Sequence, residues 1–315
     1  MGIYVGFDVG GTKCAAVTGV VENGNVRILA REAFATPALQ EEALDTLCTL
    51  AKKLAGGEEI LGIGISSGGP MNTKTGELCN PPNLPGWSGL SLTDYASKHL
   101  HAPAVLENDA NACALAEWRW GAGKGSGIML FLTFGTGLGA GIVIGGRVLQ
   151  GACGNAGELG HWRLADAGPS GYGKVGAFEG FCSGGGIAQL AQAVGLSYAQ
   201  RGEAPAWYKG EISAKSVAIA AAAGDKAALE VFDESARRLG QGLALVMDLL
   251  NPDCIVVGSV YTRAEALFQK EMHRVLQKEV LPASYEACRV VPAALGDSIG
   301  DYAALSLAVQ AAEKE

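Results

Sequence analysis

Two glycine–threonine loops constrain this chain more than any other feature: Asp8 to Lys13 (DVGGTK) and Phe134 to Gly139 (FGTGLG). Each loop follows an apolar, β-rich run, at 3–7 and 128–132, and each leads into another apolar segment. Because glycine has no Cβ, backbone N–H groups in such a bend can approach phosphate oxygens closely, and a threonine hydroxyl adds a donor. Either loop alone is equally typical of an ordinary strand turn, but the pair predicts a grip on a polyphosphate from two sides.

The composition indicates a globular protein of two domains. The chain has 315 residues, of which 18% are charged and 49% hydrophobic, and its 46 glycines form no repeat, which argues against disorder and collagen. A net charge of −8 disfavours a nucleic-acid partner. No apolar run is long enough for a membrane span, and the N-terminus lacks the order of a signal peptide, so we expect a cytoplasmic protein with no membrane partner.

The cysteines form no close pair of the CxxC type. In a chain of this size we expect reduced thiols in the core rather than a disulfide framework or a zinc knuckle. The eight residues are Cys14, Cys48, Cys79, Cys113, Cys153, Cys182, Cys254 and Cys288.

Apolar periodicity predicts alternating strands and helices, which together indicate an α/β protein. A glycine-rich run at 121–127 (GAGKGSG) marks the start of the second half, and a glycine-rich loop region is expected from Gly145 to Gly186. The expected strands are 3–9, 13–20, 60–66, 104–107, 128–134, 141–144 and 254–257. The expected helices are 40–55, 92–99, 225–250 and one that starts at Asp301.

Three familiar signatures occur without the context that each requires. The GISSG segment (64–68) matches a nucleophile elbow, but a loop continues where a helix should start. GTGLGA (135–140) matches the dinucleotide fingerprint, yet a strand is expected after it instead of a helix. GPSGYGKV (168–175) has Val175 where a Walker A loop needs a serine or threonine for Mg²⁺. We therefore set all three interpretations aside.

Two groups of polar residues remain as candidates. Asn108 and Asp109 follow an expected buried strand, at the carboxyl end where α/β sheets bind ligands. Helix capping is the alternative for Asp109 and is the more frequent role of such a residue taken alone. Glu158 and His161 are three residues apart, so one helical turn would place them on one face, where the carboxylate could orient the imidazole. A surface contact is the alternative for this pair.

Seven segments in order resemble the ROK family of sugar kinases and sugar-responsive repressors, over essentially the whole chain. They are DVGGTK (8–13), GISSGGP (64–70), NPPNLPGW (80–87), ENDANACALAEW (107–118), LTFGTGLGAGIV (132–143), GNAGELGH (154–161) and IVVGS (255–259). The resemblance implies a two-domain α/β fold of the actin-like ATPase (ribonuclease H-like) type with an interdomain cleft. It implies a small domain of 1–120, completed by a C-terminal helix at 301–315, and a large domain of 121–300 with the second phosphate loop, the adenosine site and the dimer contact.

The resemblance also implies roles for single residues. Asp8 would help to hold Mg²⁺, directly or through water, and Asp109 would be the general base that takes the proton from the attacking sugar hydroxyl. The ATP phosphates would lie against Gly10, Gly11, Thr12, Lys13, Gly135, Thr136 and Gly137, and the nucleoside against Gly258. The sugar would be held by Asn108, Asp109, Glu158, His161 and Glu179, in a pocket lined by Gly69 and Asn83.

The resemblance indicates an ATP-dependent hexose kinase, most plausibly one that phosphorylates glucose at O6, and a homodimer by analogy. N-acetylmannosamine, N-acetylglucosamine, allose, mannose and fructose remain open as acceptors, and polyphosphate remains open as donor. A sugar-sensing regulator without catalysis is the alternative class. The family's repressors carry a winged helix-turn-helix before the kinase-like part, whereas the first strand here is expected at Ile3, so we favour the enzyme.

One segment departs from the family pattern. Many members bind structural zinc through a CxCxxxxC cluster and the histidine of the GELGH segment, but Ser170, Tyr172 and Ala177 occupy the three cysteine positions here. One histidine cannot hold zinc, which needs about four ligands. We therefore expect no zinc, and a loop held by packing of Phe178, Phe181 and Tyr172.

Overall fold

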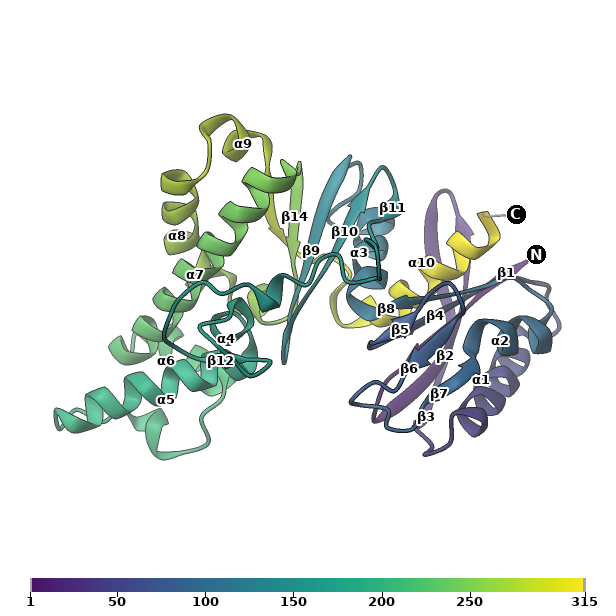
Figure 1. Ribbon diagram of the computed structural model, residues 1–315, viewed down its shortest axis with the longest axis horizontal. Helices are drawn as coiled ribbons and strands as arrows, with labels where there is room; N and C mark the ends of the chain where they lie inside the picture. The colour runs from purple at the N-terminus through teal and green to yellow at the C-terminus, as the bar shows by residue number, and fades with distance from the viewer. Residues whose placement is uncertain (1, 314–315) are drawn as a thin grey trace. The chain divides into compact units, whose positions relative to one another are not determined.

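The computed structural model describes residues 2–313 and shows a mixed α/β chain with several sheets (Figure 1). Contacts divide the chain into two compact units. The first unit consists of Met1–Gly125, Gly141–Ala156 and Ala294–Glu315, and the second of Ser126–Ala140 and Gly157–Ala293. The segments 121–125, 141–156 and 294–300 thus group with the first unit, whereas the sequence placed them in the predicted large domain.

A five-stranded sheet in the order β3-β2-β1-β4-β8 forms the centre of the first unit. β1 (Ile3–Val9) pairs antiparallel with β2 (Lys13–Glu22), which pairs antiparallel with β3 (Asn25–Ala35). On its other side β1 pairs parallel with β4 (Ile60–Ser67), and β4 with β8 (Ala104–Asn108). The first glycine loop is therefore the turn between β1 and β2, and β8 is an edge strand.

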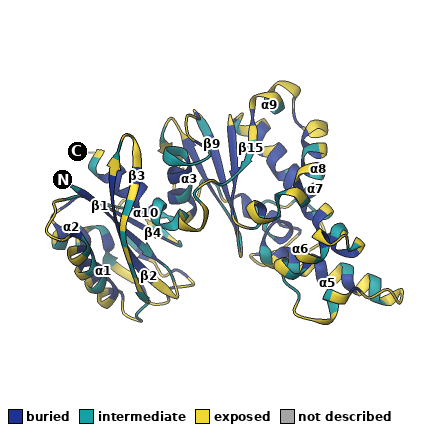
Figure 2. Ribbon diagram, turned by 180° about the vertical axis from the view of Figure 1, so that it is seen from behind, coloured by how far each residue is buried: buried dark blue, intermediate teal, exposed yellow. Residues whose placement is uncertain are grey.

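Helices cover both faces of this sheet (Figure 2). Val5 of β1 and Ile63 of β4 point into a core shared with α1 (Gln40–Ala55) and α2 (Leu92–Leu100). The alternate residues of the same strands face the opposite way. That second face is covered by α10 (Ile299–Glu313), which also packs against α3 (Asp109–Trp120) through Leu307.

Glycine lets α10 lie close to the sheet. A Cβ placed on Gly64 of β4 would overlap the backbone of Ala304 and would lie 2.6 Å from the Cβ of Leu307. The helix backbone therefore rests directly on β4, without a layer of side chains between them. A small antiparallel sheet of β5 (Met71–Asn72), β6 (Glu77–Cys79) and β7 (Ser88–Ser91) completes the unit.

The second unit is built on β9 (Ile128–Phe134), β14 (Cys254–Val257) and β15 (Arg289–Pro292), which pair in parallel in that order. β10 (Leu138–Ile144) lies on the other side of β9, and β11 (Arg147–Val148) follows β10 at that edge of the sheet. The helices of this unit are α5 (Gly184–Gln200), α6 (Ala214–Ala222), α7 (Lys226–Leu250), α8 (Val260–Glu279) and α9 (Pro282–Ala287).

Phe268 of α8 lies at the centre of an aromatic core in the second unit. Its ring centroid is 5.4 Å from those of Phe134 and Phe232 and 5.6 Å from that of Tyr261. The contacts with Phe134 and Phe232 are edge-on, an arrangement that aromatic quadrupoles favour. The core thereby joins the end of β9 to α7 and α8.

The glycine-rich stretch expected as a loop contains short elements. They are β11, a 3₁₀ turn η1 (Leu159–His161), a hairpin of β12 (Ser170–Gly171) and β13 (Lys174–Val175), and α4 (Phe178–Phe181). Two further 3₁₀ turns are η2 (Ala206–Lys209) and η3 (Gly296–Ser298).

Most expected elements are confirmed, but several observed ones, such as α6, α8, α9 and β15, were not expected. The strands 3–9, 128–134 and 254–257 and the helix 40–55 match to the residue. β10 begins at Leu138 and not at Gly141, and α10 begins at Ile299 and not at Asp301. β3 was not expected, because most of its side chains alternate between exposed and half-buried.

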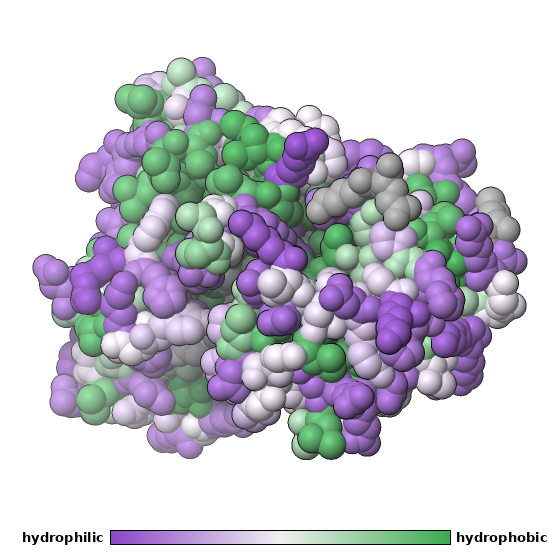
Figure 3. All heavy atoms as spheres, turned by 45° about the vertical axis from the view of Figure 1, so that its right-hand side comes forward, coloured by the Kyte–Doolittle hydropathy of each residue, from purple (hydrophilic) through white to green (hydrophobic). Residues whose placement is uncertain are grey.

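All eight cysteines are free thiols, and five of them are buried. The expectation that they belong to the core is wrong for Cys79 and Cys153, which are exposed. Among residues 2–313, no helix combines the length and the apolar character needed to cross a membrane. Polar side chains cover much of the face drawn in Figure 3, with apolar groups gathered in smaller patches.

Candidate active site

The first glycine loop is a closed bend with an exposed tip. The Gly10 N–H donates to the Lys13 carbonyl at 3.0 Å, and the Thr36 hydroxyl donates to the Gly10 carbonyl at 2.6 Å. Gly11, Thr12 and Lys13 are exposed. Hydrogen bonds from the backbone and from the Thr36 hydroxyl therefore hold the base of the loop, while its tip is exposed.

Asp8 lies beside this loop among other charged groups. Burial raises the pKa of Asp8, and the neighbouring carboxylates of Asp301 and Asp109 raise it further, whereas Arg31 lowers it. Arg31 also pairs with Asp301 at 2.8 Å. Burial and the neighbouring carboxylates disfavour the negative charge of Asp8. A bound cation would stabilise that charge, so this position fits a cation site.

Magnesium fits this position when phosphate supplies other ligands. Within residues 2–313 no group of three or more His, Cys, Asp or Glu side chains is arranged to hold a metal ion. Mg²⁺, however, is usually bound by one or two carboxylates together with substrate phosphates and water. Asp8 is the residue that would hold it, and the ion would neutralise charge on the transferred phosphate.

Asn108 and Asp109 lie at the junction of β8 and α3, as expected. Asn108 is the N-cap of α3, and its side-chain oxygen accepts from the Ala110 N–H at 3.0 Å. Asp109 is exposed in the first turn, and its Oδ1 lies 2.8 Å from the same N–H. The capping position that the sequence offered as the alternative for Asp109 thus belongs to Asn108.

Glu107 holds this junction in place through hydrogen bonds, and it was not predicted from the sequence as part of the site. It is 6% exposed, and its Oε1 accepts from the Asn108 N–H at 2.9 Å and from Asn111 Nδ2 at 3.0 Å. Its Oε2 accepts from Gln150 Nε2 at 2.7 Å. A buried carboxylate with three donors is a rigid anchor, so it fixes the backbone that carries Asn108 and Asp109.

Gly69 and Asn83 each lie next to another predicted site residue. A Cβ on Gly69 would be 3.7 Å from Asn108 Nδ2. A Cβ on Gly11 would overlap the carbonyl of Asn83 and lie 2.9 Å from its Cβ. The first unit therefore brings Gly69 to Asn108, and the first glycine loop to Asn83.

The rejected nucleophile elbow has no helix after it in the structure. β4 ends at Ser67 and the short strand β5 follows, while Ser66 and Ser67 are buried. The Ser67 hydroxyl donates to the Val9 carbonyl at 3.1 Å. This serine therefore tethers the strand next to the first glycine loop.

The second glycine loop, Gly135 to Gly137, joins β9 to β10. The Gly135 N–H donates to the Gly137 carbonyl at 3.0 Å, and the Leu138 N–H donates to Glu179 Oε2 at 3.0 Å. A strand follows the loop instead of a helix, which agrees with setting aside the dinucleotide fingerprint. Glu179, predicted to bind sugar, is bonded to the end of this loop.

The N-terminus of α5 adjoins this loop and is a feature that sequence reasoning missed. The Gly184 N–H donates to the Gly135 carbonyl at 2.8 Å, and Ser183 caps the helix by accepting from the Gly186 N–H at 2.9 Å. The N-terminal end of a long helix carries partial positive charge and favours phosphate. The sequence feature that could have predicted this helix start is the run SGGG (183–186), with a serine cap before glycines.

Gly258 follows β14 and is buried, with its N–H donating to the Leu132 carbonyl at 2.9 Å. The next residue, Ser259, was not predicted as a site residue. It has a left-handed φ of 60°, and its Oγ lies 3.6 Å from where a Cβ of Gly135 would be. Gly258 and Ser259 therefore border the second glycine loop.

Glu158 and His161 lie close together around η1, as their spacing predicted. Glu158 Oε2 is 3.8 Å from His161 Nε2, and Lys174 Nζ donates to the His161 carbonyl at 2.6 Å. Tyr172 stacks on the His161 ring. Ordinary side-chain contacts thus hold the histidine within this unit.

Phe178 and Phe181 pack the segment in which the family resemblance implies cysteines. Both are buried, and Arg238 lies over the Phe181 ring at 4.7 Å from its centroid. Tyr172 differs from the expectation, because it is 73% exposed and contacts His161 instead of joining the core. The absence of zinc stays a prediction that rests on Ser170, Tyr172 and Ala177.

The candidate residues are divided between the two units. The first unit contains Asp8, Gly10, Gly11, Thr12, Lys13, Gly69, Asn83, Asn108 and Asp109, and the second contains Gly135, Thr136, Gly137, Glu158, His161, Glu179 and Gly258.

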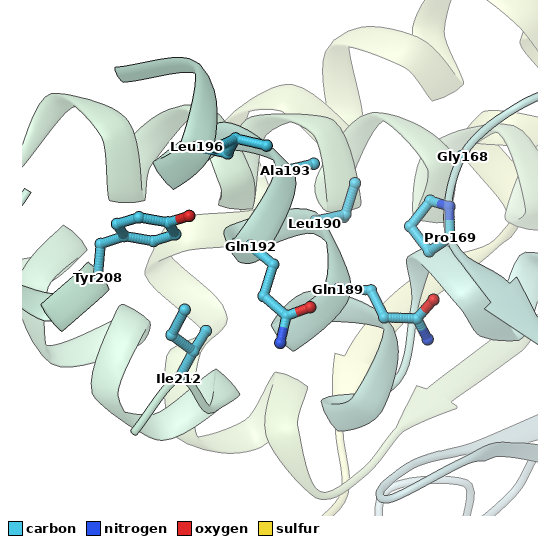
Figure 4. A pocket seen from close by; sticks show the side chains of 9 residues that line it. All are labelled: Gly168, Pro169, Gln189, Leu190, Gln192, Ala193, Leu196, Tyr208 and Ile212. Atoms are coloured by element: carbon cyan, nitrogen blue, oxygen red, sulfur yellow. The ribbon is translucent and has the colours of Figure 1, made fainter. Parts of the chain in front are cut away.

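A cavity of about 890 Å³ in the second unit contains none of these residues (Figure 4). Leu190, Leu196, Tyr208 and Ile212 give it a largely apolar lining. It therefore offers no carboxylate or cation for the chemistry expected here.

Solved structures establish the fold class. The ROK hexokinase from Thermus thermophilus superposes with a TM-score of 0.82 at 29% identity, covering 99% of this chain and 100% of that one. A ROK glucokinase from Streptomyces griseus, solved with glucose and AMPPNP, gives 0.74 at 32% identity, covering 98% and 99%. The predicted α/β fold of the actin-like ATPase type is confirmed.

The chain belongs to the ROK family, whose family model matches residues 4–311. It is 32% identical over 315 residues to the glucokinase of Streptomyces coelicolor, with 98% of both chains covered. It is 33% identical over 264 residues to the N-acetylmannosamine kinase of Escherichia coli O9:H4, with 82% and 83% covered. These relatives support a sugar kinase, and kinase homology implies ATP with Mg²⁺ as its general partner.

Proposed function

We propose that this protein is an ATP-dependent glucokinase that transfers the γ-phosphate to O6 of glucose. The observation that carries the proposal is the grouping of Asp109, Asp8 and the first glycine loop in one unit. Asp109 and Asp8 are near enough for the charge of one to raise the pKa of the other. A base for the sugar hydroxyl, a magnesium carboxylate and a phosphate loop are the parts that phosphoryl transfer requires.

The roles divide between acceptor and donor. Asp109 takes the hydroxyl proton, while Asn108, Glu158, His161 and Glu179 bind the other hydroxyls, and Gly69 and Asn83 line the pocket. Carboxylates suit this task because a sugar hydroxyl can donate a charge-assisted hydrogen bond to them. The loops at 10–13 and 135–137 bind the phosphates, with Asp8 on Mg²⁺ and Gly258 against the nucleoside.

An N-acetylmannosamine kinase is the second candidate. A specific observation favours it, since a relative of that name is 33% identical over 82% of the chain. The same carboxylates could hold the hydroxyls of either sugar. The two candidates differ in whether the pocket accepts an N-acetyl group.

A coupled assay of ADP release tests the proposal. Glucose, N-acetylmannosamine, N-acetylglucosamine, allose, mannose and fructose are compared by kcat/KM with ATP and Mg²⁺, and polyphosphate replaces ATP in a parallel series. Phosphorus–proton correlation NMR of the product identifies the phosphorylated oxygen. We expect glucose to rank first with product at O6, and a higher rank for an N-acetylhexosamine would overturn glucose as the substrate.

We also propose a homodimer that works in the cytoplasm, where ATP and sugars meet. Analytical ultracentrifugation of the purified chain tests the assembly, since a monomer at micromolar concentration would contradict it. Localisation of a tagged chain by fractionation tests the compartment.

A further inference from the structure

A second cavity, of about 820 Å³, lies wholly within the first unit and contains no residue predicted to bind ATP or sugar. It borders the edge strand β8 at Val105, Leu106 and Glu107. Its other walls are Trp118 and Arg119 at the end of α3, the turn between β10 and β11, and the last turn of α10. Its volume is within the range of about 300–1,000 Å³ typical of small-molecule sites.

Two cations without a protein partner distinguish this cavity. Lys74, Arg119 and Arg147 line it together with two carboxylates, Glu107 and Glu313. Glu313 is paired with Arg119 through two bonds of 2.5 and 3.0 Å. Glu107 already accepts three hydrogen bonds.

The remaining two cations are exposed: Lys74 and Arg147 make no ion pair or hydrogen bond through their side chains within residues 2–313. Arg119 Nε is buried and lacks an acceptor in the same part of the chain. Two unpaired cations, Lys74 and Arg147, thus line one cavity in a protein whose net charge is −8. Cations held unneutralised in a concave site attract an anion.

The rest of the lining suits a ligand with hydroxyl groups. Thr73 and Gln310 contribute a hydroxyl and an amide, while Leu106 and Val148 contribute apolar surface for a carbon skeleton. An inorganic ion alone would leave most of the volume and these amide and hydroxyl groups unused. We propose that this cavity binds a small phosphorylated polyol, with Arg147 and Lys74 on the phosphate and Thr73 and Gln310 on hydroxyls.

One residue that lines the cavity, Glu107, also anchors the backbone of the candidate active site. Gln150 lines the cavity and donates to Glu107 at 2.7 Å, and Glu107 accepts from the Asn108 N–H at 2.9 Å. A ligand that draws Gln150 away from Glu107 therefore changes how firmly the Asn108–Asp109 turn is held. This coupling rests on the proposed kinase function, whereas binding at the cavity does not.

Calorimetric titration tests the binding. The probes are glucose 6-phosphate, glycerol 3-phosphate and inorganic phosphate, added to protein saturated with glucose and a non-hydrolysable ATP analogue, so that the candidate active site is blocked. The double variant Lys74→Gln/Arg147→Gln is compared with Lys52→Gln/Arg201→Gln, whose residues are also exposed and whose net charge changes by the same amount. Thermal melts confirm that both variants are folded.

We expect both phosphorylated polyols to bind more tightly than inorganic phosphate, with at least a tenfold loss in the Lys74/Arg147 variant and none in the control. Tighter binding of glucose 6-phosphate would identify a hexose phosphate as the natural ligand, and tighter binding of glycerol 3-phosphate a smaller phosphate. No binding by the unmodified protein, or equal losses in the two double variants, would overturn the site.

The coupling has its own readout. The bound ligand should change the KM for sugar by about fivefold or more, the lower end of usual allosteric couplings, and Gln150→Met should abolish the change while ligand still binds. An unchanged KM in the unmodified protein would refute the coupling. Loss of kinase activity with all sugars while the phosphate still binds would refute the proposed function and leave the cavity site intact.

Discussion

The ring of Tyr172 lies stacked on the imidazole of His161, with ring centroids 4.5 Å apart and planes inclined by 29°. Tyr172 occupies a position where the family resemblance implies a cysteine, and Lys174 of the same hairpin donates to the His161 carbonyl. An aromatic contact and a lysine of one hairpin thus hold His161 in place.

Replacing Tyr172 by alanine should weaken sugar binding. An aromatic pair contributes about 0.5–1.5 kcal/mol, so we expect the KM for sugar to rise about two- to tenfold with little change in kcat. Tyr172→Phe keeps the ring and should behave as the unmodified enzyme. Steady-state kinetics of the two variants check this, and equal KM values for both would show that the stack does not position His161.

Asp109→Asn should abolish most turnover and leave sugar binding intact. The amide cannot accept the hydroxyl proton, and loss of a general base typically lowers the rate by about 10²- to 10⁴-fold. Single-turnover kinetics and sugar titration separate the two effects. The same change at the exposed Asp94 serves as control, and a nearly normal kcat in Asp109→Asn would remove Asp109 from the mechanism.

Gly11→Ala should weaken the binding of both ATP and sugar, because a Cβ at this position overlaps the Asn83 carbonyl. Overpacking costs about 1–3 kcal/mol, and the loop and Asn83 must move apart to relieve it. We expect the KM values for ATP and for sugar to rise together. Gly210→Ala adds a methyl group where no atom lies within 4 Å and should change neither. A rise in the KM for ATP alone would exclude Asn83 from the sugar pocket.

Asp8 should titrate above its ordinary pKa of 3.8 in the metal-free protein, because burial and the Asp301 carboxylate disfavour its charged form. The stabilisation linked to this raised pKa is fully present below the unfolded value and is lost as the pH rises through the folded value. Asp301→Asn removes a negative neighbour and frees Arg31 from its partner, so the pKa of Asp8 should fall.

Carboxyl NMR titration of the metal-free protein measures this pKa directly. Asp166→Asn, an exposed change in the second unit, is the control and should leave it unaltered. A pKa at or below 3.8 in the unmodified protein, or one that Asp301→Asn raises, would contradict the assignment of causes.

The parts of the fold that could be predicted are those with a strong local pattern. β14 is buried at every position, so its apolar run identified it. Gly139, in contrast, lies inside β10 although glycine disfavours strands, and pairing with neighbouring strands overrides that preference. α5 was hidden in the same way, because it begins with three glycines behind the Ser183 cap.

In the candidate site, too, the residues in local motifs could be predicted and those with distant partners could not. The motifs located the two glycine loops and the Asn108–Asp109 turn because each is local. Glu107 was missed because its partner Gln150 is 43 residues away. The same holds for a contact outside the site: Glu117 is fully buried and accepts from the N–H groups of Ala294 and Leu295, the former 177 residues away, which no local pattern predicts.

The contact between α10 and β4 sets an order of events during synthesis. The strands of the first unit leave the ribosome early, whereas the helix that covers one face of their sheet begins only at residue 299. Until then Gly64 and its neighbours have no layer over them, whereas the sheet and helices of the second unit are already complete at residue 293. The second unit can therefore finish folding on the nascent chain, and the first must wait until α10 has left the ribosome.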